Sequence, residues 1–179
     1  MDFAEHAARS RGFDGFSYGD MAEAIGIRKA SIHYHFPTKA NLSEALIERY
    51  QTNLQHRLAE IEATHATAGA RLKALIALYR AALDDGRTVC LCVAFSTSLE
   101  SLSEVVIARV SAVRAMILQW ITATFELGQR DGSISAILDP AYEAPATLAM
   151  LEGAHLAART EEDLVAFDVA TRLLNARCQ

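Results

Sequence analysis

Apolar side chains recur every three or four residues along most of this chain, which is the spacing of one face of an α-helix. No segment shows the strict apolar–polar alternation of a half-buried strand. The pattern therefore predicts an all-α protein. About nine helices are expected, at residues 2–11, 18–25, 29–36, 38–63, 68–85, 90–101, 103–130, 144–158 and 161–177.

Turn-forming and capping residues set the expected ends of several helices. Ser17 and Asp20 have the three-residue spacing of a capping box, in which each side chain accepts from the other residue's backbone N–H. Gly26 follows as an expected left-handed helix end, because glycine adopts that conformation at little cost. Gly86 is expected to end the helix that begins at residue 68. Pro145 is expected in the first turn of its helix, where a missing N–H costs little.

One long helix is expected to join two parts of the fold. It begins after Pro37, which blocks the preceding helix, and Thr38 is a good N-cap for it. We expect an N-terminal helix-turn-helix domain at residues 1–47 and a C-terminal helical domain at residues 48–179. With 51% hydrophobic residues, a chain of 179 residues can bury a core without disulfides or a structural metal.

The two short helices joined by the turn at Gly26 form a pattern typical of a helix-turn-helix. In that motif the second helix enters the major groove of DNA, and its first residues contact base edges. The net charge of the whole chain is −5, which taken alone argues against DNA binding. Residues 24–43, however, contain no acidic residue and carry Arg28, Lys29 and Lys39. The alternative is an ordinary helical hairpin whose basic residues face solvent.

The second helix of this pair also carries side chains that suit contact with DNA. Ser31, His33, Tyr34 and His35 offer hydroxyl and imidazole groups that can hydrogen-bond phosphates or base edges. Ala30 is small enough to allow close approach. Five apolar residues are expected to pack the motif from inside, namely Met21, Ile25, Ile27, Ile32 and Phe36.

The segment RGFDGFSYGDMAEAIGIRKASIHYHFPTK at residues 11–39 resembles the DNA-binding region of TetR-family transcriptional repressors, most specifically in the letters YHFPTK. The resemblance implies a domain of three helices plus the start of a fourth. It also implies a set of DNA-contacting residues: Ser17, Arg28, Lys29, Ala30, Ser31, His33, Tyr34, His35 and Lys39.

Two features depart from the pattern of that family. His33 stands where the family most often has tyrosine. Family members also usually carry a basic arm and another helical turn before the first helix, and residues 1–11 do not supply them. Either Met1 is not the native start of the protein, or this chain holds DNA through fewer phosphate contacts.

The C-terminal half resembles one branch of the same family, which includes electrophile sensors, in the segments VCLC at 89–92, FELGQRDGSI at 125–134 and LEGA at 151–154. Cys90 and Cys92 lie among apolar neighbours. They are therefore either small buried side chains or thiol sensors, with Arg87 close enough in sequence to stabilise a thiolate.

The resemblance further implies that the C-terminal domain binds a small-molecule inducer. Aromatic or polar side chains on otherwise apolar helices are the candidates for that pocket, namely Tyr79, Cys92, Phe95, Trp120, Thr124 and His155. A mostly apolar cavity with few polar groups suits a drug-sized ligand. The alternative for each of these residues is a place in the core.

Members of this family also dimerise through their last two helices. In this chain those helices carry small residues that permit close crossing, namely Ala144, Ala146, Ala149, Gly153, Ala154 and Ala157. Seven apolar residues are expected to join them in a self-complementary interface across a two-fold axis, namely Leu148, Leu151, Leu156, Leu164, Val165, Phe167 and Leu173. The alternative is packing of the same two helices within one chain.

The residues give little support to other classes of function. No glycine-rich phosphate loop, metal-ligand cluster or nucleophile–base spacing stands out, so no enzyme, cofactor or metal is expected. No uninterrupted apolar run reaches the roughly 18 residues that span a bilayer, and the N-terminus does not resemble a signal peptide. Three sparse cysteines favour a reducing compartment. We therefore expect a cytoplasmic protein without membrane contact.

Together these features predict a ligand-responsive transcriptional repressor. It would act as a homodimer on a near-palindromic double-stranded operator and be released by a small-molecule inducer. The alternative is a helical ligand-binding or adaptor protein without sequence-specific DNA binding.

Overall fold

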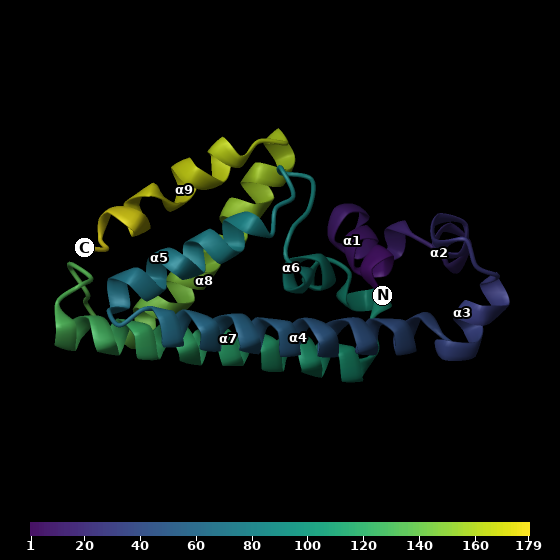
Figure 1. The fold of residues 1–179 in the computed structure, drawn as a ribbon, viewed down its shortest axis with the longest axis horizontal. Coiled ribbons are helices and arrows are strands. Elements are labelled where there is room, and N and C mark those ends of the chain that lie inside the picture. Colours follow the sequence, from purple (N-terminus) through teal and green to yellow (C-terminus); the bar gives the residue numbers. More distant parts are fainter. The chain divides into compact units, whose positions relative to one another are not determined.

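The computed structural model describes residues 1–179 and contains nine α-helices, two short 3-10 helices and no strand, apart from one isolated bridge between Ile134 and Cys178. This confirms the all-α class. The elements in chain order, shown in Figure 1, are α1 (Asp2–Arg11), η1 (Phe13–Gly15), α2 (Tyr18–Ile25), α3 (Lys29–His35), α4 (Lys39–Thr64), α5 (Ala68–Ala81), α6 (Leu91–Ser96), η2 (Leu99–Ser101), α7 (Glu104–Asp131), α8 (Pro140–Glu161) and α9 (Leu164–Ala176).

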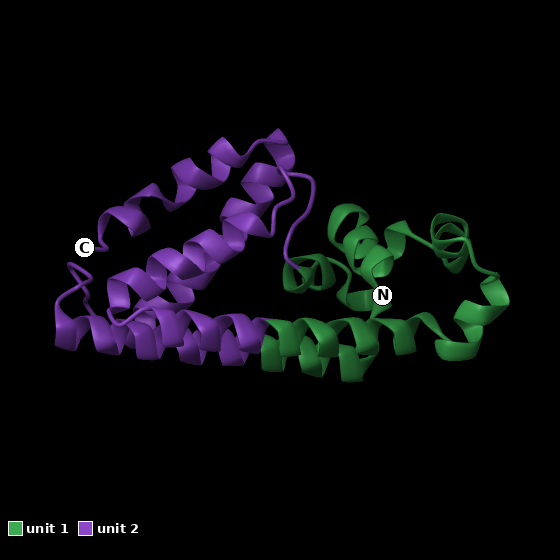
Figure 2. Cartoon of the chain, in the orientation of Figure 1, with its two compact units in different colours: residues 1–53, 91–113 green, residues 54–90, 114–179 purple.

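The chain packs into two compact units, which Figure 2 colours separately. Unit 1 holds residues 1–53 and 91–113, and unit 2 holds residues 54–90 and 114–179. Helix α6 and the start of α7 therefore group with the N-terminal helices in unit 1. The expected functional boundary between residues 47 and 48 stays a prediction, because this grouping describes packing.

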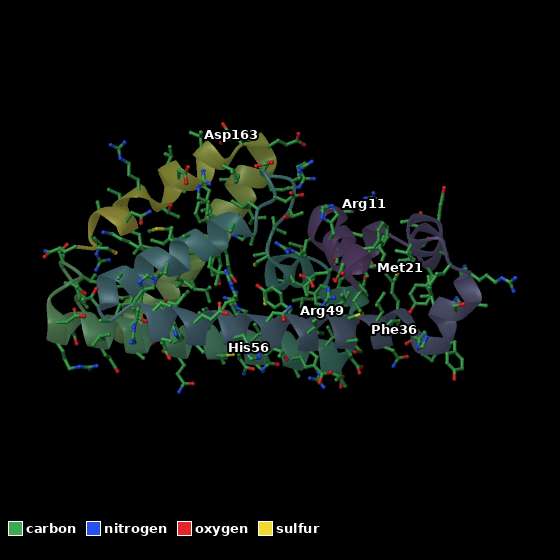
Figure 3. The ribbon with its side chains drawn as sticks, viewed as in Figure 1. Arg11, Met21, Phe36, Arg49, His56 and Asp163 are labelled. Carbon is green, nitrogen blue, oxygen red and sulfur yellow. The ribbon has the colours of Figure 1, made fainter.

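Unit 1 is held together by small, aromatic and charged side chains. Helix α1 buries three alanines, so its backbone can approach its neighbours closely. The ring of Phe13 in η1 meets the ring of Phe95 in α6 edge to face, with 5.4 Å between centroids. Arg49 of α4, labelled in Figure 3, binds Asp2 at 2.5 Å and Glu5 at 2.6 Å, which ties α1 to α4.

Unit 2 has an apolar core that α5, α8 and α9 share. Leu72 and Leu75 of α5, Leu148 and Leu151 of α8, and Phe167 of α9 are all fully buried. The expectation that Leu148, Leu151 and Phe167 lie at a dimer interface is therefore wrong, because they pack within one chain. Ala144 and Ala154 of α8 are buried in the same way.

Helix ends agree with the expected signals where the chemistry is local. Ser17 and Asp20 form the reciprocal capping box at the start of α2. Gly26 ends α2 in the left-handed conformation, with φ 69° and ψ 30°. Thr38 precedes α4 and accepts the Asn41 N–H at 3.2 Å.

Several expected helix boundaries are wrong. The helix expected at residues 90–101 is α6, which ends at Ser96 and is followed by the separate 3-10 helix η2. Helix α8 continues to Glu161, where the next helix was expected to begin, and α9 begins at Leu164. Helix α5 ends at Ala81 and not near residue 85, because Asp84 and Asp85 have positive φ angles and cannot continue a right-handed helix. Helix α8 begins at Pro140, where Asp139 caps it by accepting the Ala141 N–H at 2.9 Å. Pro145 therefore lies inside the helix and not in its first turn.

Helix α7 is the one helix that is long and apolar enough to cross a membrane, judged by length and composition. Core helices of soluble proteins meet the same two criteria, so this property does not by itself indicate a membrane protein.

Candidate DNA-binding surface and effector region

The junction between α2 and α3 is a tight turn built around Gly26. The backbone N–H groups of Gly26 and Ile27 both donate to the carbonyl of Ala22, which closes the end of α2. Helix α3 then starts after Arg28 and buries only Ile32. A short helix that buries one side chain presents nearly all of its other side chains to solvent.

Those exposed side chains include every residue expected on the recognition helix. Arg28, Lys29, Ala30 and Ser31 at its start and His33, Tyr34 and His35 in its later turns are all exposed. The Tyr34 side chain is 83% exposed. The structure thus brings seven of the nine expected DNA-contacting residues together on α3 and its N-cap.

The expected packing inside the motif is correct only in part. Met21 and Ile32 are buried and Phe36 is half-buried, but Ile25 and Ile27 are 46% and 44% exposed. The expectation that these two residues face inward is wrong. Ile25 is the last residue of α2 and Ile27 lies in the turn, so the chain is already leaving the packed face there.

Ser17 and Lys39, the other two expected DNA-contacting residues, lie at the starts of α2 and α4 and have partners within the chain. The Ser17 hydroxyl donates to Asp20 Oδ2 at 2.8 Å. Hydrogen bonds from the backbone N–H and the hydroxyl of Ser17 hold the pKa of Asp20 below its usual value.

Lys39 Nζ donates to the Phe16 carbonyl at 2.8 Å and lies 4.6 Å from the ring centroids of Phe13 and Phe16. Burial lowers the pKa of Lys39. An ammonium group has three donors, so one bond to Phe16 leaves donors for a phosphate. Ser17 and Lys39 therefore both stabilise the local fold, and their contact with DNA stays a prediction.

Tyr18 is a residue of this site that the sequence interpretation missed. Its side chain is buried, and its hydroxyl donates toward the carbonyls of Phe36 at 2.9 Å and Thr38 at 2.7 Å. Its ring meets the His33 ring edge to face at 4.7 Å. The sequence signal for this residue is a tyrosine directly after the N-cap Ser17, because a buried phenol hydroxyl usually has a hydrogen-bond partner.

In unit 2, the expected ligand residues Tyr79 and His155 form part of the core. His155 is completely buried, and its Nδ1 accepts the Cys90 N–H at 3.0 Å. Its Nε2 lies 2.9 Å from the Tyr79 carbonyl, which can only accept, so Nε2 carries the proton. Both ring nitrogens of His155 are therefore bonded within the chain.

The other four expected ligand residues divide between the two units. Cys92 and Phe95 are buried on α6 in unit 1, whereas Trp120 and Thr124 lie on α7 in unit 2. The Thr124 hydroxyl donates to the Trp120 carbonyl at 3.0 Å. Trp120 lines a groove of about 350 Å³ between α4 and α7, which none of the other five residues lines. The structure thus does not gather the six residues into one of its described grooves.

All three cysteines are buried thiols without a disulfide. Arg87, which the sequence places near Cys90, instead binds the carboxylate of Asp84 at 3.1 Å and lies 3.9 Å from that of Asp85. The guanidinium group therefore faces carboxylates. A role for Cys90 and Cys92 as sensors stays a prediction.

Comparison with known proteins decides the family. Residues 1–46 match the family model described as bacterial regulatory proteins, tetR family. Residues 68–174, more than half of the chain, match the model described as tetracyclin repressor-like, C-terminal domain. The chain belongs to the TetR family. The helices α2 and α3 lie within the residues that match the family's N-terminal model.

Individual relatives agree with this TetR-family assignment. The chain is 30% identical over 90 residues to the HTH-type transcriptional regulator TtgR of Pseudomonas putida, a match that covers 49% of this chain and 43% of TtgR. The match therefore spans less than half the length of that relative. The structure of a TetR-family regulator from Agrobacterium tumefaciens is 29% identical, with a TM-score of 0.92 over 99% of this chain and 94% of that chain.

A third structure is AibR in complex with isovaleryl coenzyme A and operator DNA. It has a TM-score of 0.72 and 19% identity, and the match covers 97% of each chain. At that identity the likeness concerns the fold.

Proposed function

We propose that this TetR-family chain is a transcriptional repressor that binds a near-palindromic operator as a homodimer and leaves it when a small molecule binds. The exposed surface of α3 carries the proposal. Residues 28–31 and 33–35 are all solvent-facing, and none of them is acidic. Side chains of this kind at the start of a recognition helix can bond base edges and phosphates together.

In this proposal α3 enters the major groove and the starts of α2 and α4 meet the flanking phosphates. The N-terminus of a helix offers backbone N–H donors and a positive dipole end to an anion. Lys39 Nζ reaches the carbonyl next to Ser17, so these two helix starts lie close together. A protein with the same fold binds operator DNA.

The exposed faces of α8 and α9 support the homodimer. Val165, Val169 and Leu173 are exposed at four-residue steps along α9, which places them on one stripe. On α8, Gly153 and Leu156 are also exposed. We propose that these faces pair across a two-fold axis, because a self-complementary apolar face is what a symmetric dimer buries. Its two recognition helices would then lie about 34–36 Å apart, or at a related spacing.

A small-molecule inducer would act by population shift. It would bind the C-terminal part of the chain more tightly in a conformer whose recognition helices are wrongly spaced for the operator. A structure of the same fold holds both isovaleryl coenzyme A and operator DNA, so this fold can bind both kinds of ligand. We place the protein in the cytoplasm, where its DNA would lie.

The test is a gel shift with the DNA upstream of the protein's own gene, at a stated salt concentration, against a scrambled duplex of equal length. A shift that prefers the upstream DNA is expected, together with a weaker shift for Tyr34→Ala. Tyr34 is 83% exposed, so its removal leaves the packing intact. Isovaleryl coenzyme A is the first inducer probe. Equal binding to both duplexes would instead favour a helical adaptor or ligand carrier.

A further inference from the structure

The N-terminal residue of α2 is bonded to the far end of the recognition helix. Tyr18 is the first residue of α2, yet its hydroxyl reaches the carbonyls of Phe36 and Thr38, at 2.9 and 2.7 Å. These carbonyls stand on either side of Pro37, between the end of α3 and the start of α4. Figure 3 shows Phe36 at this junction. One side chain therefore connects three helices of the DNA-binding region.

The Phe36 carbonyl has no backbone donor within α3, whereas the Thr38 carbonyl also accepts the Leu42 N–H at 3.3 Å. The last carbonyls of a helix have no N–H partner within the helix, and Pro37 has no N–H to give. The Phe36 carbonyl lies just past the last turn of α3, where the Phe36 N–H still bonds back to the Ile32 carbonyl at 2.8 Å. The Tyr18 hydroxyl, whose single proton is shared between two acceptors, supplies a donor from outside α3.

The ring of Tyr18 makes a second contact with α3. It meets the ring of His33 edge to face, with 4.7 Å between centroids. His33 is itself exposed on the recognition helix. Tyr18 thus limits both where α3 ends and which way the His33 side chain points.

We infer that Tyr18 is a positioning residue for operator recognition: its hydroxyl and ring fix the register of α3 and the direction of His33, although Tyr18 itself is too buried to touch DNA. This inference rests on the proposed function. Base readout requires side chains placed against particular base edges, whereas non-specific binding depends mainly on phosphate contacts. Loss of the Tyr18 hydroxyl should therefore reduce specificity more than it reduces general DNA binding.

Two features of the surroundings agree with this role. Burial raises the pKa of Tyr18, so the phenol remains a proton donor at neutral pH. Close by, Lys39 Nζ donates a second hydrogen bond between the same segments, to the Phe16 carbonyl at 2.8 Å. The segments 16–18 and 36–39 thus each donate a side-chain hydrogen bond to the other. Only the bonds from Tyr18 reach the end of α3.

The experiment compares operator and scrambled DNA by fluorescence anisotropy, using the full chain and three variants. Tyr18→Phe removes only the hydroxyl. A second variant carries 4-aminophenylalanine at position 18, which restores a donor at the same place. Tyr142→Phe is the control, because this tyrosine is 77% exposed on α8 and loses the same atom. Thermal melts monitor the folding of each variant.

We expect Tyr18→Phe to lower operator affinity about tenfold, the usual scale for one hydrogen bond whose acceptor is left behind. Affinity for scrambled DNA should change less than about twofold, because it depends on charge. The 4-aminophenylalanine variant and Tyr142→Phe should both keep the wild-type ratio of the two affinities.

Two results would overturn the inference: a ratio of the two affinities that is unchanged in Tyr18→Phe, whether or not both affinities fall, or a folded 4-aminophenylalanine variant with a reduced ratio. The last result decides the matter even where Tyr18→Phe does not fold. A wild-type protein without preference for the operator would instead contradict the proposed function, so the two failures are distinguishable.

Discussion

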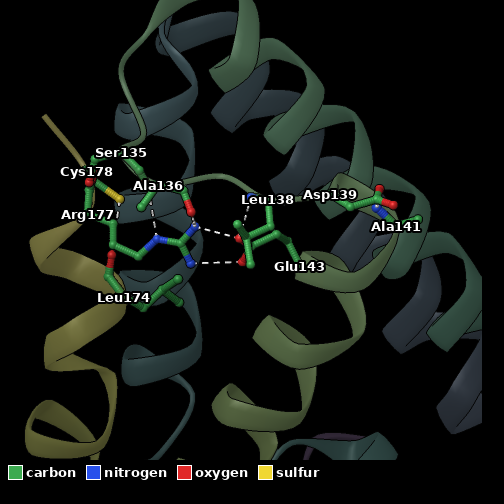
Figure 4. A network of polar contacts seen from close by, with 9 residues as sticks. All are labelled: Ser135, Ala136, Leu138, Asp139, Ala141, Glu143, Leu174, Arg177 and Cys178. Carbon is green, nitrogen blue, oxygen red and sulfur yellow. Dashed lines mark hydrogen bonds and ion pairs between the residues drawn. The ribbon is translucent and has the colours of Figure 1, made fainter.

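Arg177, just past the end of α9, binds Glu143 in the first turn of α8 through two parallel hydrogen bonds. Nη1 donates to Oε2 at 2.8 Å and Nη2 to Oε1 at 2.7 Å, as Figure 4 shows. The same guanidinium group also donates to the carbonyls of Ser135 and Ala136, each at 3.1 Å. One side chain thus fastens the end of α9 to the loop before α8 and to α8 itself, with the planar geometry that favours arginine.

Replacement of Glu143 by glutamine should remove an acid-sensitive part of the stability. The Arg177 hydrogen bonds hold the pKa of Glu143 below its ordinary value of 4.5. A carboxyl whose pKa is lower in the folded state contributes stability above its unfolded pKa, and that stability is lost as the pH falls through the folded pKa. At neutral pH, Glu143→Gln should cost about 1–3 kcal/mol. Thermal melts from pH 7 to pH 3 measure both effects.

The control for this change is Glu62→Gln, which neutralises an exposed carboxyl on α4. Its melting curves should follow those of the wild type. The midpoints of wild type and Glu143→Gln should converge as the pH falls below about 4.5, because protonation of Glu143 weakens the same contact. A constant gap down to pH 3 would show that the charge of Glu143 does not stabilise the fold.

Lys39→Ala should weaken binding to operator and scrambled DNA alike. If its ammonium group meets a phosphate, the slope of log K against log salt should become shallower by about one. The variant should also melt at a lower temperature, because it loses the bond to the Phe16 carbonyl. Lys73→Ala on α5 serves as control, since it removes an equal charge from an exposed site outside the DNA-binding unit. An unchanged salt slope would show that Lys39 bonds to the Phe16 carbonyl but does not contact a phosphate.

The sequence was most informative where the physical cause of a feature is local. The ends of α1 and α2 and the Ser17–Asp20 capping box depend on residues three or four positions apart, and these predictions are confirmed. The start of α8 was also a local signal, since Asp139 and Pro140 are a better helix start than the later Pro145. The expected start near residue 144 is wrong because Pro145 is compatible with a helix interior here, while Asp139 and Pro140 supply the N-cap and first residue.

Long-range partners could not be predicted in the same way. Tyr18 finds its acceptors 18 and 20 residues away, and His155 finds Cys90 and Tyr79 across 65 and 76 residues. Periodicity places such residues on a helix face but does not say which polar groups will face them. Among the candidate ligand residues, His155 and Thr124 have such partners within the chain, whereas Trp120 Nε1 is buried without one.

His155→Ala should destabilise the fold by about 2–4 kcal/mol, because it removes a buried ring together with the acceptor for Cys90 and the donor for Tyr79. Chemical denaturation measures this loss. His56→Ala is the matched control. His56, labelled in Figure 3, lies exposed on α4, so its replacement should change stability by less than about 0.5 kcal/mol. Equal stability of His155→Ala and wild type would contradict the structural role of His155 and restore it as a candidate ligand residue.

Val169→Glu should separate the proposed dimer into monomers. Val169 lies between Val165 and Leu173 on the exposed stripe of α9, and a charge buried there without a partner opposes association. Sedimentation velocity should show a dimer for the wild type and a monomer for the variant, with loss of operator affinity because each half-site is then held alone. Val105→Glu, at an exposed valine of α7 in unit 1, should remain dimeric and keep its operator affinity. A dimeric Val169→Glu protein would place the interface elsewhere, and a monomeric wild type would refute the dimer itself.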